Sequence, residues 1–245
     1  YPLRRQRQMC IRDSIPLGGK LLASGGYNLA FLARGGCPVP DFSRWEDGAA
    51  IPARYRLCRP STDHMEQMLL DRLRPEDRIV LVSNLAGYLS SLQGPARERA
   101  EASYATAIRR LGTAVVSREA RMVIFAPLPT VPQTKLSGPL TLCQPEWFRP
   151  SWSQAPQCRP VQQPRAAQIA ATDQVRSFLQ RLVAEVPGTA LFDPFDSVCP
   201  PDADQCSSHR GSNLLFSDDN HLTNAGAWLL YPRFRVFLAS PSPAS

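Results

Sequence analysis

The hydrophobic positions of this chain alternate between short apolar runs and longer segments with helical spacing. Runs with the length and composition of β-strands lie at residues 27–33, 78–83, 121–126 and 189–193. Apolar residues recur at helical spacing in residues 63–73, 96–120, 164–186 and 222–239. The run at 78–83 is apolar at consecutive positions, as in strands buried on both faces of a parallel sheet. The alternation predicts an α/β fold in which helices cover both faces of a parallel sheet.

Local patterns refine three of these segments. Asp63 and Glu66 have the spacing of a capping box, so we expect a helix to begin there and to continue to about Leu73. Gly188 follows the helix predicted at 164–186 and fits its C-cap. Residues 127–163 are rich in proline and lack periodicity, which predicts a long loop or ordered insertion rather than a second domain.

Composition and charge narrow the class of protein. The chain is 43% hydrophobic and 20% charged, as in ordinary globular proteins, and no apolar run approaches the ~20 residues that cross a bilayer. The formal net charge is +7, but the cations are nearly all arginine and are scattered between acids, without a basic stripe that carries aromatic residues. We therefore expect neither a membrane-spanning helix nor a nucleic-acid partner.

The cysteines indicate an oxidising compartment. Setting Cys10 aside leaves an even number, namely Cys37, Cys58, Cys143, Cys158, Cys199 and Cys206. Six thiols allow many pairings, and pairing of successive cysteines is the most economical, with each pair enclosing a loop rich in proline and polar residues. No Cys-x-x-Cys occurs and the three histidines lie at unrelated spacings, so we expect no zinc site.

The first residues have a different character from the rest. Residues 8–14 resemble the in-frame translation of a transposon adaptor used to prepare sequencing libraries. We therefore expect residues 1–14 to be a non-native, adaptor-derived segment, residues 15–240 to form the domain, and residues 241–245 to be a disordered tail. The alternative for the first segment is a native basic arm.

One segment has the spacing of catalytic groups. Asp218 precedes His221 by three residues at the predicted start of a helix. That spacing lets a carboxylate hold one imidazole nitrogen while the other faces a substrate, as the base of a serine esterase requires. The competing interpretation is that Asp218 caps the helix and His221 is a surface residue.

Two further positions follow predicted strands, where open parallel sheets place their sites. Asn84 comes directly after the strand at 78–83, and its amide could stabilise a tetrahedral oxyanion. The alternative is a turn residue that bonds its own backbone. Gly35 and Gly36 follow the strand at 27–33, where a backbone N–H could approach a ligand closely, or where two glycines simply form a turn.

Together these segments resemble a known family. The residues that carry the resemblance are Asn84 after its apolar strand, the Asp218-x-x-His221 block, Gly226-Ala227, Gly36-Cys37-Pro38 and residues 192–200. They resemble the SGNH hydrolase superfamily, and more narrowly the periplasmic SGNH domain fused to bacterial membrane O-acyltransferases. The resemblance spans about residues 15–240, and its most specific part is residues 218–226.

The resemblance implies roles for individual residues. His221 would be the general base, Asp218 its orienting acid, and Asn84 with the N–H of Gly36 the oxyanion hole. The nucleophile of the family is a serine in a Gly-Asp-Ser-His block at the end of the first, central strand. This chain has Arg12-Asp13-Ser14-Ile15 instead, followed by a helix expected at residues 15–25. Ser14 is thus a doubtful nucleophile, and we expect the native serine to lie upstream.

The resemblance implies a fold, a three-layer α/β sandwich with a parallel, flavodoxin-like sheet, and it also implies a function. An SGNH domain of this kind would transfer an acyl group through an acyl-serine to a sugar hydroxyl of a cell-surface glycan such as lipopolysaccharide. The acyl donor would be delivered by a membrane acyltransferase domain, outside the cytoplasm, with no metal or soluble cofactor. The alternatives are a free-standing periplasmic carbohydrate esterase and a catalytically inactive glycan-binding module.

Overall fold

The computed structural model describes residues 11–25, 27–32, 37, 39–40, 58–90, 92–131, 160–218 and 220–240, without the side chains of residues 11–14 and 59. The described helices are α1 (Ile11–Ala23), α3 (Arg59–Arg72), α4 (Leu85–Leu89), α5 (Gly94–Val116), α6 (Arg165–Glu185), α7 (Phe195–Val198) and α8 (Asn224–Ala239). The described strands are β1 (Arg78–Leu81), β2 (Arg121–Phe125), β3 (Gln162–Pro164), β4 (Thr189–Phe192), β5 (Gln205–Ser207), β6 (His209–Arg210) and β7 (Asn213–Leu214).

The central sheet of the described residues has the order β1-β2-β4, and both pairings are parallel. Ile79 lies opposite Met122 and Met122 lies opposite Thr189, so the three strands are in step across the sheet. The strands predicted at 78–83, 121–126 and 189–193 are therefore confirmed, together with their parallel direction and the α/β fold.

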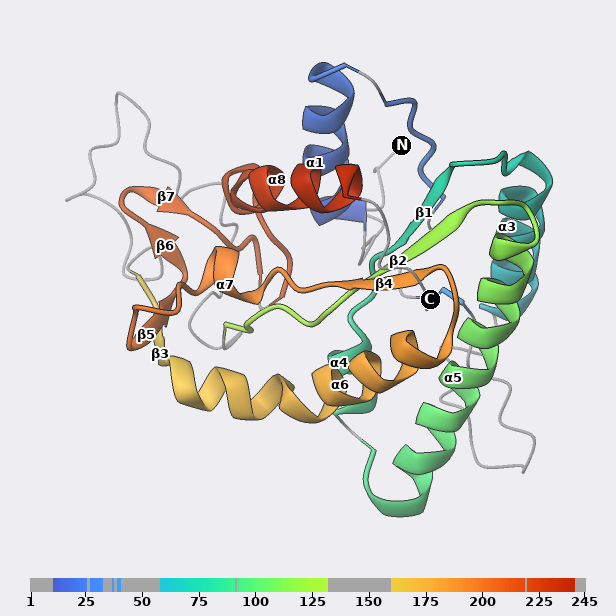
Figure 1. Cartoon of the computed structure of the whole chain (residues 1–245). Helices are drawn as coiled ribbons and strands as arrows, with labels where there is room; N and C mark the ends of the chain where they lie inside the picture. Colours follow the sequence, from blue (N-terminus) through green and yellow to red (C-terminus); the bar gives the residue numbers. More distant parts are fainter. Residues whose placement is uncertain are drawn as a thin grey trace, which may run out of the picture.

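Helices cover both faces of this sheet (Figure 1). On one face, Val123 and Phe125 of β2 and Phe192 of β4 pack with residues of α1 and α8. There the ring of Phe234 lies 5.1 Å from that of Phe125 and 4.9 Å from that of Phe192, centroid to centroid. On the other face, Ile79, Leu81, Met122 and Ile124 pack against α5 and α6. Alternate residues of each strand thus pack into two separate hydrophobic cores, because successive side chains of a pleated β-strand point to opposite faces of the sheet.

The strand predicted at 27–33 is not formed in its described part, residues 27–32. Residues 27–32 have neither helical nor strand structure, and Leu29, Phe31 and Leu32 are exposed. A strand needs a neighbour that completes its backbone hydrogen bonds, and the described sheet ends at β1 without reaching this segment. Its apolar composition is that of a strand, but the partner that would order it is not among the described residues.

Several helix boundaries differ from the sequence-based expectations. α1 begins at Ile11 rather than at residue 15, and α3 begins at Arg59 rather than at Asp63. The capping-box interpretation was wrong because Pro60 occupies the first turn of α3, where proline is favoured, and Asp63 lies inside the helix. The predicted helix at 164–186 is confirmed by α6. Its C-cap is Val186 rather than Gly188, because the backbone already leaves the helix at Val186, and Gly188 follows two residues later with a positive φ of 67°.

Two disulfides join the described segments. Cys37 bonds Cys58 and Cys199 bonds Cys206, which confirms two of the predicted pairs. The pair Cys143–Cys158 and the unpaired state of Cys10 lie outside the described residues. The proline-rich segment lies outside them as well, except for residues 127–131 and 160–163.

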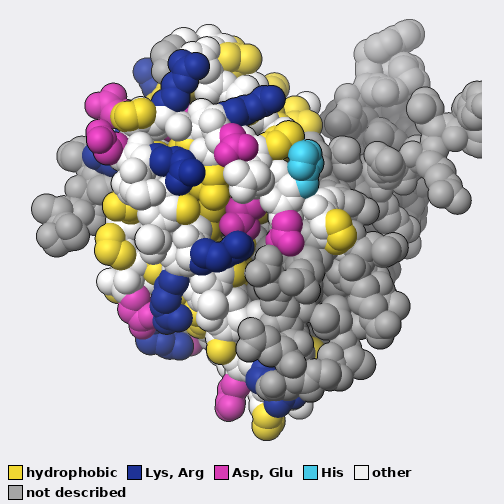
Figure 2. Space-filling view, turned by 90° about the vertical axis from the view of Figure 1, so that its right-hand side faces the viewer, with side chains coloured by type: hydrophobic (Ala, Val, Ile, Leu, Met, Phe, Trp, Pro, Cys, Tyr) yellow, Lys and Arg dark blue, Asp and Glu magenta, His cyan; other side chains and the backbone are white. Residues whose placement is uncertain are grey.

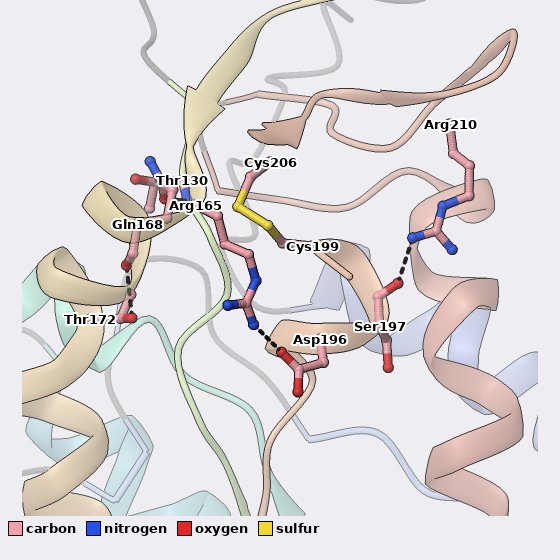
Figure 3. Close-up of a disulfide and its surroundings, with 9 residues drawn as sticks. All are labelled: Thr130, Arg165, Gln168, Thr172, Asp196, Ser197, Cys199, Cys206 and Arg210. Carbon is pink, nitrogen blue, oxygen red and sulfur yellow. Dashed lines mark hydrogen bonds and ion pairs between the residues drawn. A yellow bond between two sulfur atoms is a disulfide. The ribbon is translucent and has the colours of Figure 1, made fainter. Parts of the chain in front are cut away.

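The Cys199–Cys206 disulfide lies beside a polar cluster that ties peripheral elements to the sheet domain (Figure 3). Arg165, the first residue of α6, pairs with Asp196 of α7 at 2.8 Å. Gln168 of α6 accepts a hydrogen bond from the backbone N–H of Thr130, also at 2.8 Å. The ion pair thus joins α6 to α7, and the disulfide joins the end of α7 to β5.

Candidate active site

The Asp218–His221 segment forms a tight loop ahead of α8. Phe216 and Leu222 form an antiparallel bridge, and the backbone N–H of Ser217 donates to the carbonyl of His221 at 2.7 Å. Between them, one oxygen of Asp218 accepts the backbone N–H groups of Asn220 and His221 at 3.1 and 2.8 Å. The backbone of the loop therefore holds the Asp218 carboxylate in place independently of its contact with the imidazole.

The carboxylate also holds the imidazole. Nδ1 of His221 lies 2.7 Å from Oδ1 and 2.6 Å from Oδ2 of Asp218. His221 is buried, with 8% of its surface exposed, whereas the side chain of Asp218 is partly exposed. The contact to Nδ1 assigns Nε2 as the nitrogen that would exchange a proton with a nucleophile or substrate. The predicted hydrogen bond between the two side chains is confirmed.

Electrostatics keep the Asp218 carboxylate ionised. Burial by itself would raise the pKa of Asp218. The side-chain hydrogen bond and charge of His221, together with the backbone N–H groups of Asn220 and His221, outweigh burial and lower the pKa below its ordinary value. An ionised carboxylate on Nδ1 orients the ring and stabilises the imidazolium that forms when Nε2 takes a proton.

The capping interpretation of Asp218 is wrong, because Thr223 caps α8. Its hydroxyl accepts the backbone N–H of Gly226 at 3.2 Å and donates to the carbonyl of Leu214 at 2.5 Å. Thr223 lies inside the helix that the sequence pattern predicted from residue 222, so the pattern did not indicate it as a cap. A threonine just ahead of the apolar periodicity is the ordinary N-cap pattern and could have identified it.

Asn84 lies at the carboxyl side of β1 and caps the short helix α4. Its Oδ1 accepts the backbone N–H of Gly87 at 2.9 Å, as the turn interpretation predicted for this residue. A Cβ added at Gly87 would lie 2.5 Å from Nδ2 of Asn84, so the glycine leaves room for the amide. The side-chain amide of Asn84 thus bonds α4, and its convergence on one site with Asp218 and His221 stays a prediction.

The other expected site residues lie largely outside the described part. Gly35 and Gly36 are not described, although their neighbour Cys37 is fixed by its disulfide to Cys58. The backbone of Ser14 belongs to α1, and its side chain is not described.

A second serine–histidine contact was not singled out from the sequence. The hydroxyl of Ser208 lies 2.8 Å from Nδ1 of His209 and accepts the backbone N–H of Val161, also at 2.8 Å. Ser208 is fully buried, and burial lowers the pKa of His209. The hydroxyl of Ser208 is inaccessible to a substrate and already accepts a backbone hydrogen bond. Its contact with His209 is therefore structural, and the pair is not a candidate nucleophile and base.

An apolar cavity of about 240 Å³ lies next to the His221 loop. Leu222 contributes to its wall, together with Val80 and Val82 at β1 and the residues 28–32. Leu230 and Phe234 of α8 and Leu17 of α1 are among the other apolar residues that line it.

The described residues contain no cluster of three or more His, Cys, Asp or Glu side chains suited to a metal ion. None of the described helices is both long and apolar enough to span a membrane. On the face in Figure 2, Lys and Arg side chains are interspersed with Asp and Glu rather than gathered in one basic patch.

Comparison with known proteins agrees with the resemblance seen in the sequence. The family model described as "SGNH domain (fused to AT3 domains)" matches residues 18–236, which is most of the chain. A search of curated proteins and a search of solved structures each found no significant match. The chain belongs to the family of SGNH domains that occur fused to AT3 acyltransferase domains.

Proposed function

We propose that this domain transfers an acyl group, which we take to be acetyl, to a hydroxyl of a cell-surface glycan through an acyl-serine. The observation that carries the proposal is the contact of both carboxylate oxygens of Asp218 with Nδ1 of the buried His221. Membership of a family fused to acyltransferase domains supports acyl transfer as the reaction class.

In the proposed reaction His221 acts as general base and then as general acid. Its Nε2 takes the proton of the serine hydroxyl while the oxygen attacks the acyl carbonyl, and it gives that proton to the departing donor group. The glycan hydroxyl then attacks the acyl-serine, passes its proton to Nε2, and the serine oxygen recovers it as the ester leaves. Asn84 and the N–H of Gly36 are the proposed donors to the oxyanion formed in each step.

Ser14 is not the nucleophile in this proposal. The family match begins at residue 18, four positions after Ser14, and residues 12–15 lack the glycine and histidine of the family's serine block. We propose instead that the serine belongs to a native segment upstream of α1, and that residues 1–14 are not part of the native domain.

The location and partners form part of the same proposal. Disulfides persist in oxidising compartments, so Cys37–Cys58 and Cys199–Cys206 favour a position outside the cytoplasm, in the periplasm. There an AT3 membrane domain would deliver the acyl group, and a surface glycan such as lipopolysaccharide would accept it.

The test is hydrolysis of a chromogenic acetyl ester by the purified chain and by three variants. We expect slow turnover, because base catalysis of water by His221 remains without an acyl-serine. His221→Ala should lower that turnover by ~10²-fold, the scale of general-base catalysis. Ser14→Ala and His64→Ala, the latter an exposed histidine on α3, should leave it unchanged.

Two outcomes would contradict parts of the proposal. If His221→Ala and His64→Ala give equal rates, His221 is not the base. If robust turnover is lost in both His221→Ala and Ser14→Ala, Ser14 is a working nucleophile and the exclusion of residues 1–14 from the native domain is wrong.

A further inference from the structure

The surface where α1 meets α8 carries an exposed aromatic side chain beside a lysine. Trp228 of α8 is 47% exposed, and Nζ of Lys20 on α1 lies 4.9 Å from the centroid of the indole ring. The same ammonium lies 5.2 Å from the ring centroid of Tyr231, which follows Trp228 by three residues on α8. The lysine therefore contacts two aromatic rings at once, and both distances are within the range of cation–π attraction.

The charge of Lys20 has no acidic partner in the described part of the chain. The ion pairs found there join arginine or histidine side chains to carboxylates, and none includes Lys20. An ammonium carries three N–H donors, and two aromatic rings accept at most two of them. The surface beside it is open, because a Cβ added at Gly19 would meet nothing within 4 Å. At least one N–H of Lys20 is therefore available to solvent or to a ligand.

This surface lies close to the proposed active site. α8 begins at Asn224, three residues after His221, and Trp228 follows one turn later. With a rise of ~1.5 Å per residue, Trp228 lies about 6 Å along the axis of α8 from Asn224. A chain-like ligand that passes over Trp228 is thus within the length of a short oligosaccharide of His221.

We propose that Trp228, Tyr231 and Lys20 form a binding site for a pyranose that carries a carboxylate, as in a uronic acid. The sugar would stack its weakly electropositive C–H face on the exposed part of the indole, since the π face of an aromatic ring is electronegative. The available N–H of Lys20 would donate to the carboxylate in a charge-assisted hydrogen bond. That this sugar is part of the acceptor glycan rests on the proposed function.

The arrangement disfavours other small ligands. Aromatic side chains that bind a quaternary ammonium group leave the space over their rings to that cation, whereas here Lys20 occupies it and would repel a second cation. A phosphate monoester carries roughly −1.5 to −2 charges at pH 7, which one ammonium does not balance. A uronic acid matches the surface, because it combines an apolar ring face with a single negative charge.

Titration of the isotope-labelled chain with trigalacturonate, followed by NMR, tests the site without relying on catalysis. We expect the indole N–H of Trp228 and the backbone N–H groups of Gly19 and Lys20 to shift as the sugar binds. The fully methyl-esterified trisaccharide has the same rings without the charge. It should bind ~10-fold more weakly, the scale of a lost hydrogen bond between charged groups.

Two variants separate stacking from charge. Trp228→Ala and Lys20→Met should each weaken the binding of trigalacturonate ~10-fold. Arg181→Met is the matched control, because Arg181 is an exposed residue of α6, which packs on the opposite face of the sheet from α8. This change also removes one positive charge and should leave the affinity unchanged. The spectra show whether each variant is folded, and the shifts in the parent chain require no variant.

Shifts confined to other parts of the chain would overturn the inference, as would equal affinities for the charged and the esterified trisaccharide. If Lys20→Met and Arg181→Met weaken binding equally, the sugar responds only to net charge, and the inference is wrong. If vesicles of phosphatidylethanolamine and phosphatidylglycerol shift the same signals and trigalacturonate does not, the surface binds a membrane instead.

The inference and the proposed function can fail separately. Shifts at Trp228, together with equal ester hydrolysis by His221→Ala and His64→Ala, would uphold the sugar site and contradict the proposed function. Hydrolysis that depends on His221, without shifts at Trp228, would do the reverse.

Discussion

At the scale of single residues, the site depends on the contact between Asp218 and His221 and on the backbone N–H groups that hold the carboxylate. The three-residue spacing of Asp218 and His221 left a helix cap open as an alternative to their hydrogen bond, and the resemblance to the SGNH family favoured the bond. The two backbone N–H groups that fix Asp218 and the cap at Thr223 depend on the path of residues 216–223, which spacing does not reveal. Asn84 shows the opposite case, because its local bond to Gly87 follows from residue type, whereas a shared site with His221 needs tertiary structure.

Acid should destabilise the domain partly through Asp218. The folded state lowers the pKa of Asp218, so its contribution to stability is complete above the ordinary value of 3.8 and is lost as the pH falls through the lower folded value. Asp218→Asn should therefore lose less stability between pH 7 and pH 3 than the parent chain. Urea denaturation at the two pH values measures this difference.

Asp173→Asn is the matched control, since Asp173 is an exposed residue of α6. Its acid sensitivity should equal that of the parent chain. An Asp218→Asn variant as acid-sensitive as the parent would show that the carboxylate gains nothing from folding.

At the scale of elements, the strands that pair with one another in the sheet, β1, β2 and β4, were predicted correctly. The strand expected at 27–33, which has no neighbouring strand among the described residues, was not. β1, β2 and β4 are buried against helices and follow from their apolar runs. Residues 27–33 have a similar composition, but a strand also requires a neighbour, which local pattern cannot supply. α3 begins at Arg59, with a proline in its first turn, and not at the capping-box spacing of Asp63 and Glu66.

Gly226 is expected to be essential to the packing of α8. A Cβ there would lie 2.2 Å from the carbonyl oxygen of Leu215, a backbone atom that cannot move without shifting the loop that holds His221. Gly226→Ala should destabilise the domain by about 1–3 kcal/mol, as overpacking does. Thermal and urea denaturation measure the loss.

Gly19→Ala is its control, because a Cβ at Gly19 in α1 meets nothing within 4 Å. This change should be neutral or slightly stabilising, since alanine favours helices. Equal stability of the two variants would mean that α8 does not approach Leu215 as closely as described.

At the scale of the whole molecule, the sequence predicted the three layers. That β1 lies at the edge of the described sheet is known only from the structure. Helices on both faces of parallel strands followed from alternation alone. The cavity beside β1 could not be predicted, because it arises from how α1, α8, β1 and residues 27–32 come together. Acyl transfer as a reaction class rests on the family, whereas the acceptor and the acyl group remain proposals.

The cysteine pairing predicts one free thiol in a chain of seven cysteines. Cys37–Cys58 and Cys199–Cys206 are formed, and we expect Cys143–Cys158 to complete the set and leave Cys10 unpaired. Titration of the unreduced, denatured chain with a thiol reagent should find a single reactive group, absent in Cys10→Ala. Three reactive thiols would indicate that Cys143 and Cys158 are not paired, and none would indicate that Cys10 has a partner.

The most direct test of the account is a double-mutant cycle on Asp218 and His221. If Asp218 acts through the imidazole, Asp218→Asn and His221→Ala impair one unit, and their effects are not additive. We expect the double variant to hydrolyse a chromogenic acetyl ester at the same rate as His221→Ala alone. If the two losses multiply, or if Asp218→Asn hydrolyses the ester as fast as the parent chain, the pair does not work as base and orienting acid.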